Sequence, residues 1–147
     1  ASQGQEIILH TLQDHQAPQT RSNLLIKAVL TGRSIFSYEG YINVNKNAQN
    51  TNAYQKNQNL MLSPQAKAES KPALEILANN VLCTHSATIS KINEEQIFYL
   101  ESRGIPNGIG KKLIIRGFFE NILEHITNNE TKDVLNQNIE SLQVEYV

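Results

Sequence analysis

The sequence has a single cysteine, no tryptophan and almost no net charge. One cysteine excludes an internal disulfide framework and suits a reducing compartment. Thirteen basic and fourteen acidic residues leave no excess charge, so neither nucleic acid nor an anionic membrane is indicated as a partner. No apolar run approaches the length of a membrane-spanning helix. At 147 residues the chain is long enough for one domain with a real core.

Common enzymatic signatures are also missing. There is no Ser–His–Asp order and no Walker lysine, and Gly104, Gly108 and Gly110 follow an expected helix rather than a strand, unlike a phosphate-binding loop. No Asn-Gly or Asp-Gly pair occurs, so tight two-residue hairpins are not indicated. The histidines at 10, 15 and 125 have no suggestive neighbours, and we interpret them as ordinary surface or helix residues.

Residues 6–90 have the pattern of short strands. Apolar residues recur at every second position in several runs, which is typical of strands buried on one face. The runs lie at 7–9, 24–30, 36–44, 54–62, 66–71, 74–78 and 81–89. Turn residues separate them, including Lys71–Pro72 and Asn79–Asn80. This pattern fits either a sandwich or a β-solenoid, and composition alone does not decide between them.

From residue 93 the apolar period becomes helical. Asn93 is a good N-cap, with Gln96 at the third position of a capping box. We expect this helix to end near Gly104 and Pro106 to lie in the first turn of the next. A third, more polar helix is expected over about 130–143.

The second helix is apolar around more than half of its circumference, which is wider than one core-facing stripe requires. It is therefore either buried on two sides within its own domain or keeps an apolar side for a partner. Its candidate partner-binding residues are Leu113, Ile114, Phe118, Phe119 and Ile122.

Cys83 and His85 fall two positions apart in the run 81–89, so both side chains point to the same face of the strand. One interpretation is a small buried thiol beside a histidine that bonds a backbone carbonyl. The other is a pair of metal ligands, since thiolate and imidazole both bind iron or zinc. Two ligands leave a tetrahedral site half filled, so other donors would have to come from another chain.

Several tracts resemble the SufB/SufD family, the scaffold subunits of the SUF machinery that builds iron–sulfur clusters. They are "RSNLLIKAVLTGRSIFSYEGYINV", the long tract from "AYQKNQNLMLS" to "ESRGI", and "GFFENIL". The tracts "NQNLMLS" and "KPALEI", and Cys-x-His before "SAT", are similar to SufD rather than to SufB. Family members are considerably longer than this chain, so we expect it to correspond to their C-terminal part.

The resemblance implies a mainly β fold, namely a right-handed parallel β-helix (solenoid) over 1–92 followed by a small helical subdomain over 93–147. It implies a SufB-like partner paired through the β-helix and a SufC-like ABC ATPase docked on the helical end. It also implies a location in the cytoplasm, or in the plastid stroma of a eukaryote. Because a truncated solenoid leaves a strand edge open near residues 7–9, we expect homodimers or larger self-associated forms of the isolated chain.

The resemblance also implies a ligand role for His85, donated to a nascent cluster at the interface with SufB, with Cys83 as the second candidate. SufB has carboxylates flanking the matching histidine, whereas this sequence has Thr84 and Ser86, and Ile76 stands where SufB has its cysteine. We therefore expect no cluster on the isolated chain, only a transient one shared with a partner.

The alternatives are a β-solenoid enzyme acting on carbohydrate or a purely structural β-helix module. An enzyme of that class needs clustered carboxylates and usually aromatic platforms. The acidic residues before residue 90 are spread along the chain and tryptophan is absent. We therefore expect a protein that is not an enzyme.

Overall fold

The computed structural model describes residues 1 and 4–141, which form two compact units that divide after Ser90. The first unit is built from six strands of ten residues each. They are β1 (Glu6–His15), β2 (Arg21–Leu30), β3 (Ile35–Val44), β4 (Asn52–Met61), β5 (Lys67–Ile76) and β6 (Leu82–Lys91). Strands before residue 92 and helices after it agree with the periodicity of the sequence.

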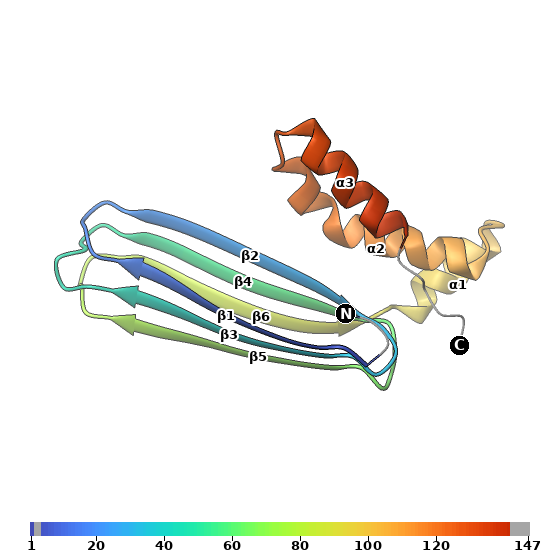
Figure 1. Cartoon of the computed structure of the whole chain (residues 1–147), viewed down its shortest axis with the longest axis horizontal. Coiled ribbons are helices and arrows are strands. Elements are labelled where there is room, and N and C mark those ends of the chain that lie inside the picture. Colours follow the sequence, from blue (N-terminus) through green and yellow to red (C-terminus); the bar gives the residue numbers. More distant parts are fainter. Residues whose placement is uncertain (2–3, 142–147) are drawn as a thin grey trace. The chain divides into compact units, whose positions relative to one another are not determined.

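Consecutive strands belong to different sheets. One three-stranded sheet has the order β1-β3-β5 and the other has the order β2-β4-β6, as Figure 1 shows. The pairs β1–β3, β3–β5 and β2–β4 are parallel and in simple register, with Glu6 beside Ile35 and Ile35 beside Lys67, and Arg21 beside Asn52. The chain crosses from one sheet to the other after each strand.

The predicted mainly β fold, a right-handed parallel β-helix over 1–92, is wrong. The structure has two three-stranded parallel sheets and three helices, which together make a sheet-rich mixed α/β fold. Alternating apolar residues identify a strand with one buried face, but they do not specify which strand lies beside it. Only the resemblance to the SufB/SufD family implied the strand neighbours of a β-helix.

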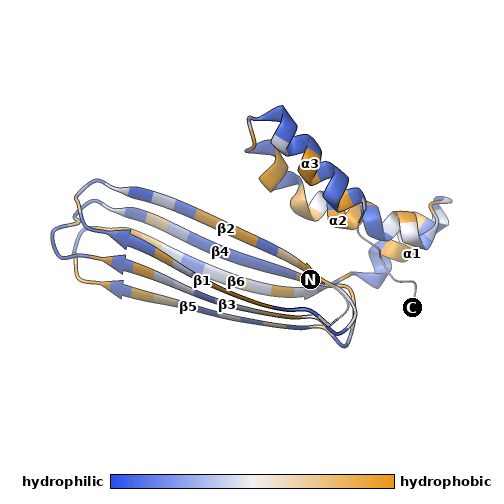
Figure 2. Cartoon of the chain, viewed as in Figure 1, coloured by the Kyte–Doolittle hydropathy of each residue, from blue (hydrophilic) through white to orange (hydrophobic). Residues whose placement is uncertain are grey.

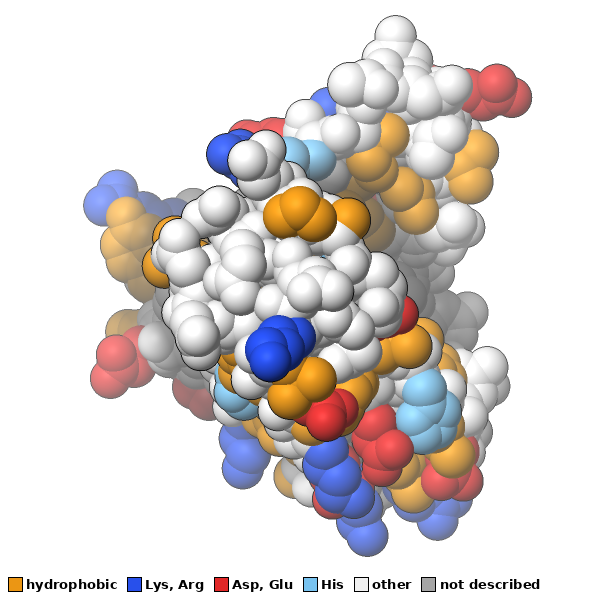
Figure 3. All heavy atoms as spheres, turned by 90° about the vertical axis from the view of Figure 1, so that its left-hand side faces the viewer, with side chains coloured by type: hydrophobic (Ala, Val, Ile, Leu, Met, Phe, Trp, Pro, Cys, Tyr) orange, Lys and Arg blue, Asp and Glu red, His pale blue; other side chains and the backbone are white. Residues whose placement is uncertain are grey.

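The core lies between the inner faces of the two sheets. One apolar cluster contains Ile42, Val44 and Ala53 with nearby loop alanines, and Leu74 and Cys83 pack against it. A second cluster forms around Leu30, Phe36 and Tyr38. Figure 3 looks at the ends of the strands where the turns lie, and there backbone atoms and uncharged side chains outside the hydrophobic class, both white, prevail in the foreground. The sheets are thus held by two apolar clusters, and their turns are polar.

Strand β5 continues through a proline. Lys71–Pro72 was expected to be a turn between two short strands, yet Pro72 lies inside the continuous strand Lys67–Ile76. Proline cannot donate a ladder hydrogen bond and is tolerated mainly in edge strands. Strand β5 is at the end of its sheet, which is the position where proline does least harm.

The second unit contains α1 (Glu94–Ser102), α2 (Asn107–Glu124) and α3 (Asn129–Glu140). Asn93 is the N-cap of α1, and its side chain accepts a hydrogen bond from the backbone N–H of Glu95 at 2.9 Å. After α1, Gly104 adopts a φ of 81° and the Gly104 and Ile105 N–H groups bond the last carbonyls of the helix. These bonds form a Schellman motif, and the helix ends near Gly104 as the sequence predicted.

Helices α1 and α2 approach closely at Gly110, where an added Cβ would lie 3.3 Å from Leu100 Cδ1. Ile97 of α1 and Ile115 and Leu123 of α2 are buried. Apolar and polar segments alternate around all three helices in Figure 2. None of the described helices is both long and apolar enough to cross a membrane.

Candidate functional site

Cys83 lies on β6 with its side chain turned toward the core. It is half-buried and packs against the cluster that contains Ile42 and Ala53. Burial raises the pKa of the Cys83 thiol, and a hydrogen bond with the Ala53 backbone only partly opposes this. A thiol held in its protonated form is a poor metal ligand, since the thiolate is the form that binds metal.

His85 follows on the same strand and is exposed. The register of β6 against β4 follows from the hydrogen bond that Leu82 N–H donates to the Thr51 carbonyl at 2.9 Å. The equivalent bond between β2 and β4, from Asn52 N–H to the Thr20 carbonyl, accompanies the pair Arg21–Asn52. By the same geometry Leu82 lies beside Asn52, and three residues further His85 lies beside Gln55. Exposure argues against a histidine that is simply packed in the core.

A group of polar atoms lies in the core beside the second apolar cluster, to which Tyr38 belongs. Tyr38 is fully buried and its hydroxyl lies 2.9 Å from Thr11 Oγ1. The Tyr38 hydroxyl and Gln55 Nε2 both lie over Gly40, where a Cβ would collide with them. Gly40 is therefore required by close approach rather than by its backbone angles. Burial raises the pKa of the Tyr38 phenol.

His15 was expected to be an ordinary surface residue, and this is wrong. It is only 5% exposed, and its ring nitrogens contact two hydroxyls, Thr20 Oγ1 at 2.7 Å and Ser22 Oγ at 2.8 Å. Ser22 Oγ in turn accepts a hydrogen bond from Gln13 Nε2 at 2.6 Å. The ring therefore links the end of β1 to the turn and the first residues of β2, a structural role.

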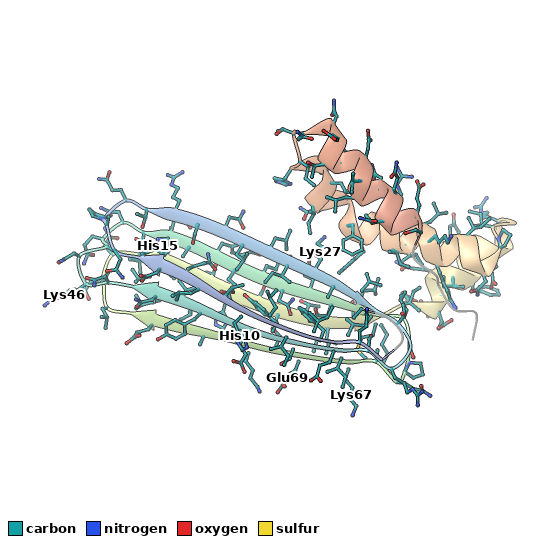
Figure 4. The ribbon with its side chains drawn as sticks, viewed as in Figure 1. His10, His15, Lys27, Lys46, Lys67 and Glu69 are labelled. Carbon is teal, nitrogen blue, oxygen red and sulfur yellow. The ribbon has the colours of Figure 1, made fainter. Side chains whose placement is uncertain are left out.

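The outer face of the β1-β3-β5 sheet carries the carboxylates that appear scattered in the sequence. His10 Nδ1 lies 3.2 Å from Glu39, and Lys71 Nζ lies 3.0 Å from Glu69. Figure 4 shows His10 and Glu69 extending from this outer side. The Glu69 carboxylate holds the pKa of Lys71 above its usual range. Glu39 thus has a partner on a neighbouring strand and Glu69 has one on its own strand, as expected of charges on a solvated sheet face.

The apolar side chains of α2 divide into buried and exposed ones. Ile115 and Leu123 are buried, whereas Ile109 and Leu113 are 53% and 46% exposed. The other candidate partner-binding residues, Ile114, Phe118, Phe119 and Ile122, are half-buried. Residues 109 and 113 are four apart and therefore share one side of the helix. An open groove of about 500 Å³ lies between α1 and α2, lined by Tyr99, Leu100 and Ile114 among others.

Within residues 1 and 4–141, no group of three or more His, Cys, Asp or Glu side chains is placed to hold a metal ion. Cys83 and His85 are brought onto one face of one strand, but they have no third ligand of these types beside them. Chemically, the pair offers one imidazole and one thiol whose pKa is raised by burial.

The sequence model of the SUF system FeS cluster assembly SufBD core domain matches residues 1–118. The chain belongs to the SufBD family. The match includes all six strands, α1 and most of α2, so both units contribute to it.

Curated relatives agree with this membership. "Protein ABCI7, chloroplastic" of Arabidopsis thaliana is 34% identical over 94% of this chain, which corresponds to 29% of that protein. An iron–sulfur cluster assembly SufBD family protein of Mycobacterium bovis is 34% identical over 95% of the chain and 37% of its own length. Another, from Synechocystis, is 39% identical over 74% of the chain. The chain thus spans between 24% and 37% of the length of these three relatives.

One residue of the polar core was missed in the sequence. Gln55 stands in "NAYQKNQN", where polar side chains occupy both faces of the strand, so alternation did not reveal which face is buried. In the structure the inner face consists of Ala53, Gln55, Asn57 and Asn59. No pattern in the sequence distinguishes these amides from the outward ones.

Proposed function

We propose that this chain is a non-enzymatic, SufD-like scaffold subunit of iron–sulfur cluster assembly. Its membership of the SufBD family supports a role in iron–sulfur cluster assembly. The SufD-like tracts and the absence of flanking carboxylates at Thr84 and Ser86 favour SufD over SufB. The observation that carries the proposal is the position of His85, an exposed imidazole on the edge strand of its sheet.

The proposed SufB-like partner pairs with the edge formed by β5 and β6. These strands end the two sheets, and large apolar side chains near them are exposed, namely Ile76, Leu77, Leu82 and Ile89. An edge strand presents unpaired backbone groups and readily accepts a further strand. Apolar exposure beside such an edge is typical of a surface that another protein covers.

His85 then contributes one ligand to a cluster that is the cargo of the complex, and the partner supplies the remaining ligands. Cys83 ranks second because burial raises the pKa of its thiol. The isolated chain, with one imidazole and one protonated thiol, is proposed to hold no cluster. As a scaffold it performs no reaction of its own.

The proposed SufC-like ABC ATPase docks on the helical unit. This unit exposes the apolar side chains of Ile109 and Leu113 on α2 and of Phe98 and Tyr99 on α1. We propose the cytoplasm as the location, or the plastid stroma in a eukaryote, which the relative named as chloroplastic supports.

Capture of the ATPase tests this function. A tagged chain co-expressed with SufB-like and SufC-like proteins should retain both. Leu113→Glu places a charge on the proposed docking surface and should reduce the retained ATPase at least tenfold, while the SufB-like protein is still retained. Val134→Glu is the matched control, because Val134 is 52% exposed on α3 outside the proposed surface. Equal ATPase capture by wild type and Leu113→Glu would refute docking at this position.

A further inference from the structure

Gln55 has a buried side chain whose hydrogen-bonding capacity is unused. The residue is 1% exposed, and neither Oε1 nor Nε2 has a hydrogen-bond partner among the described residues. A carboxamide offers two donors and an acceptor with two lone pairs. Because burying such a group unpaired is strongly unfavourable, the free amide indicates a partner that is not engaged in this conformation.

The surroundings of the amide limit what that partner can be. The hydroxyl of Tyr38 lies beside it over Gly40, but this hydroxyl bonds Thr11 and makes no hydrogen bond to the amide. On the β2 side, the register neighbour of Gln55 is Leu24, which has no polar group. Asn57 and Asn59, further along β4, bond each other at 2.7 Å.

The β6 side is different, because the register neighbour there is His85. Neighbouring strands are about 4.8 Å apart, within the reach of a glutamine and an imidazole on the same face. Cys83 packs against the cluster that contains Ala53, and Ala53 is on the same face of β4 as Gln55. Strand alternation from Cys83 to His85 therefore places His85 on the face of Gln55. Of the two register neighbours of Gln55 in its sheet, His85 alone has a hydrogen-bonding side chain.

We propose that Gln55 is the positioning residue of His85. When the ring turns inward, Gln55 Oε1 accepts the hydrogen bond from one ring N–H. This fixes the tautomer and the orientation of the ring, and it leaves the lone pair of the other nitrogen directed away from Gln55 for a metal. Metal-binding histidines usually donate their second N–H to such a partner. The metal-directed part of the inference rests on the proposed function, whereas the Gln55–His85 bond does not.

The tautomer of His85 is the direct test. In the chain labelled with ¹⁵N-histidine, imidazole spectra distinguish a protonated from an unprotonated ring nitrogen, and the signal missing from His85→Ala assigns His85. Wild type should show one dominant tautomer. Gln55→Met keeps the length of the side chain but removes the amide, and the two tautomers of His85 should then average. Leu24→Met is the matched control on the opposite side of Gln55 and should resemble wild type.

Identical His85 spectra in wild type and Gln55→Met would overturn the inference, and an internal water would then be the partner of the amide. A second readout uses the complex with the SufB-like and SufC-like proteins. There Gln55→Met should weaken cluster retention roughly 10–100-fold, the usual effect of losing such a partner. If His85→Ala leaves cluster content unchanged, the proposed ligand role fails, while the tautomer spectra still decide the role of Gln55.

Discussion

Replacing Gly40 with alanine tests the packing of the polar core. The added Cβ would lie 2.6 Å from Tyr38 Cζ, and it would collide with the Tyr38 hydroxyl and with Gln55 Nε2. Tyr38 and Gln55 are at most 1% exposed, so neither can escape into solvent. Overpacking costs about 1–3 kcal/mol, and loss of the Tyr38–Thr11 hydrogen bond adds about 1 kcal/mol. We expect Gly40→Ala to lower the free energy of unfolding of the sheet unit by about 2–4 kcal/mol.

Gly117→Ala is the matched control, because a Cβ at this exposed helical position meets no atom within 4 Å. Alanine in a helix interior is more favourable than glycine by about 1 kcal/mol, so this variant should be slightly stabilised. Native-state hydrogen exchange measures the two units separately, with β3 and β4 amides reporting on one and α2 amides on the other. If Gly40→Ala changes the stability of β3 and β4 by less than about 0.5 kcal/mol, the close approach over Gly40 is refuted.

Removing the colliding hydroxyl offers a further check on the same reasoning. Tyr38→Phe alone should be destabilising, because it deletes the bond to Thr11 Oγ1. In the double variant with Gly40→Ala, part of the collision is gone, so the combined loss should be smaller than the sum of the two single losses. Simple additivity would mean that the hydroxyl does not lie over Gly40.

Burial of Cys83 raises the pKa of its thiol, so thiolate is scarcer at neutral pH than in the unfolded chain and alkylation of Cys83 should be slower. The stability that comes from this raised pKa is lost as the pH rises through the ordinary thiol range. An equal alkylation rate in folded and unfolded chains would contradict this. His15→Leu should lower the free energy of unfolding in urea by about 1–3 kcal/mol, because Thr20 and Ser22 lose their partner. Asn23→Leu, at an exposed outward position on β2, should change this free energy little. Equal losses in the two variants would refute the structural role of His15. The strand edge at β1, with exposed Ile7 and Ile8, should make the chain self-associate in light scattering, and a monomeric mass at high concentration would argue against it.

The positions of strands and helices could be read from the sequence because each depends on local features. Period-two alternation indicated the strands, and Asn93 and Gly104 marked the ends of α1. Pro72 misled because its tolerance depends on β5 being an edge strand, which is a property of the sheet. The pairing of strands failed for the same reason, since alternation does not encode which strand is the neighbour.

The candidate site was predictable in part. Cys83 and His85 share a strand face as period two requires, but their different exposure follows from β6 being the last strand of its sheet. The burial of His15 and Gln55 could not be foreseen, because polar residues occupy both faces of their strands. The exposure of Leu113 on an apolar helix likewise depends on which side α1 covers.

Iron and sulfide content of the reconstituted complex tests the central claim, that His85 donates a ligand to a cluster shared with a SufB-like partner. Complexes of the SufB-like and SufC-like proteins with wild type, His85→Ala and Cys83→Ala are to be compared at equal protein content. His85→Ala should assemble normally, since an exposed side chain contributes little to folding, yet hold clearly less iron and sulfide. Cys83→Ala should have a smaller effect on cluster content. Equal iron and sulfide in wild type and His85→Ala would contradict the claim.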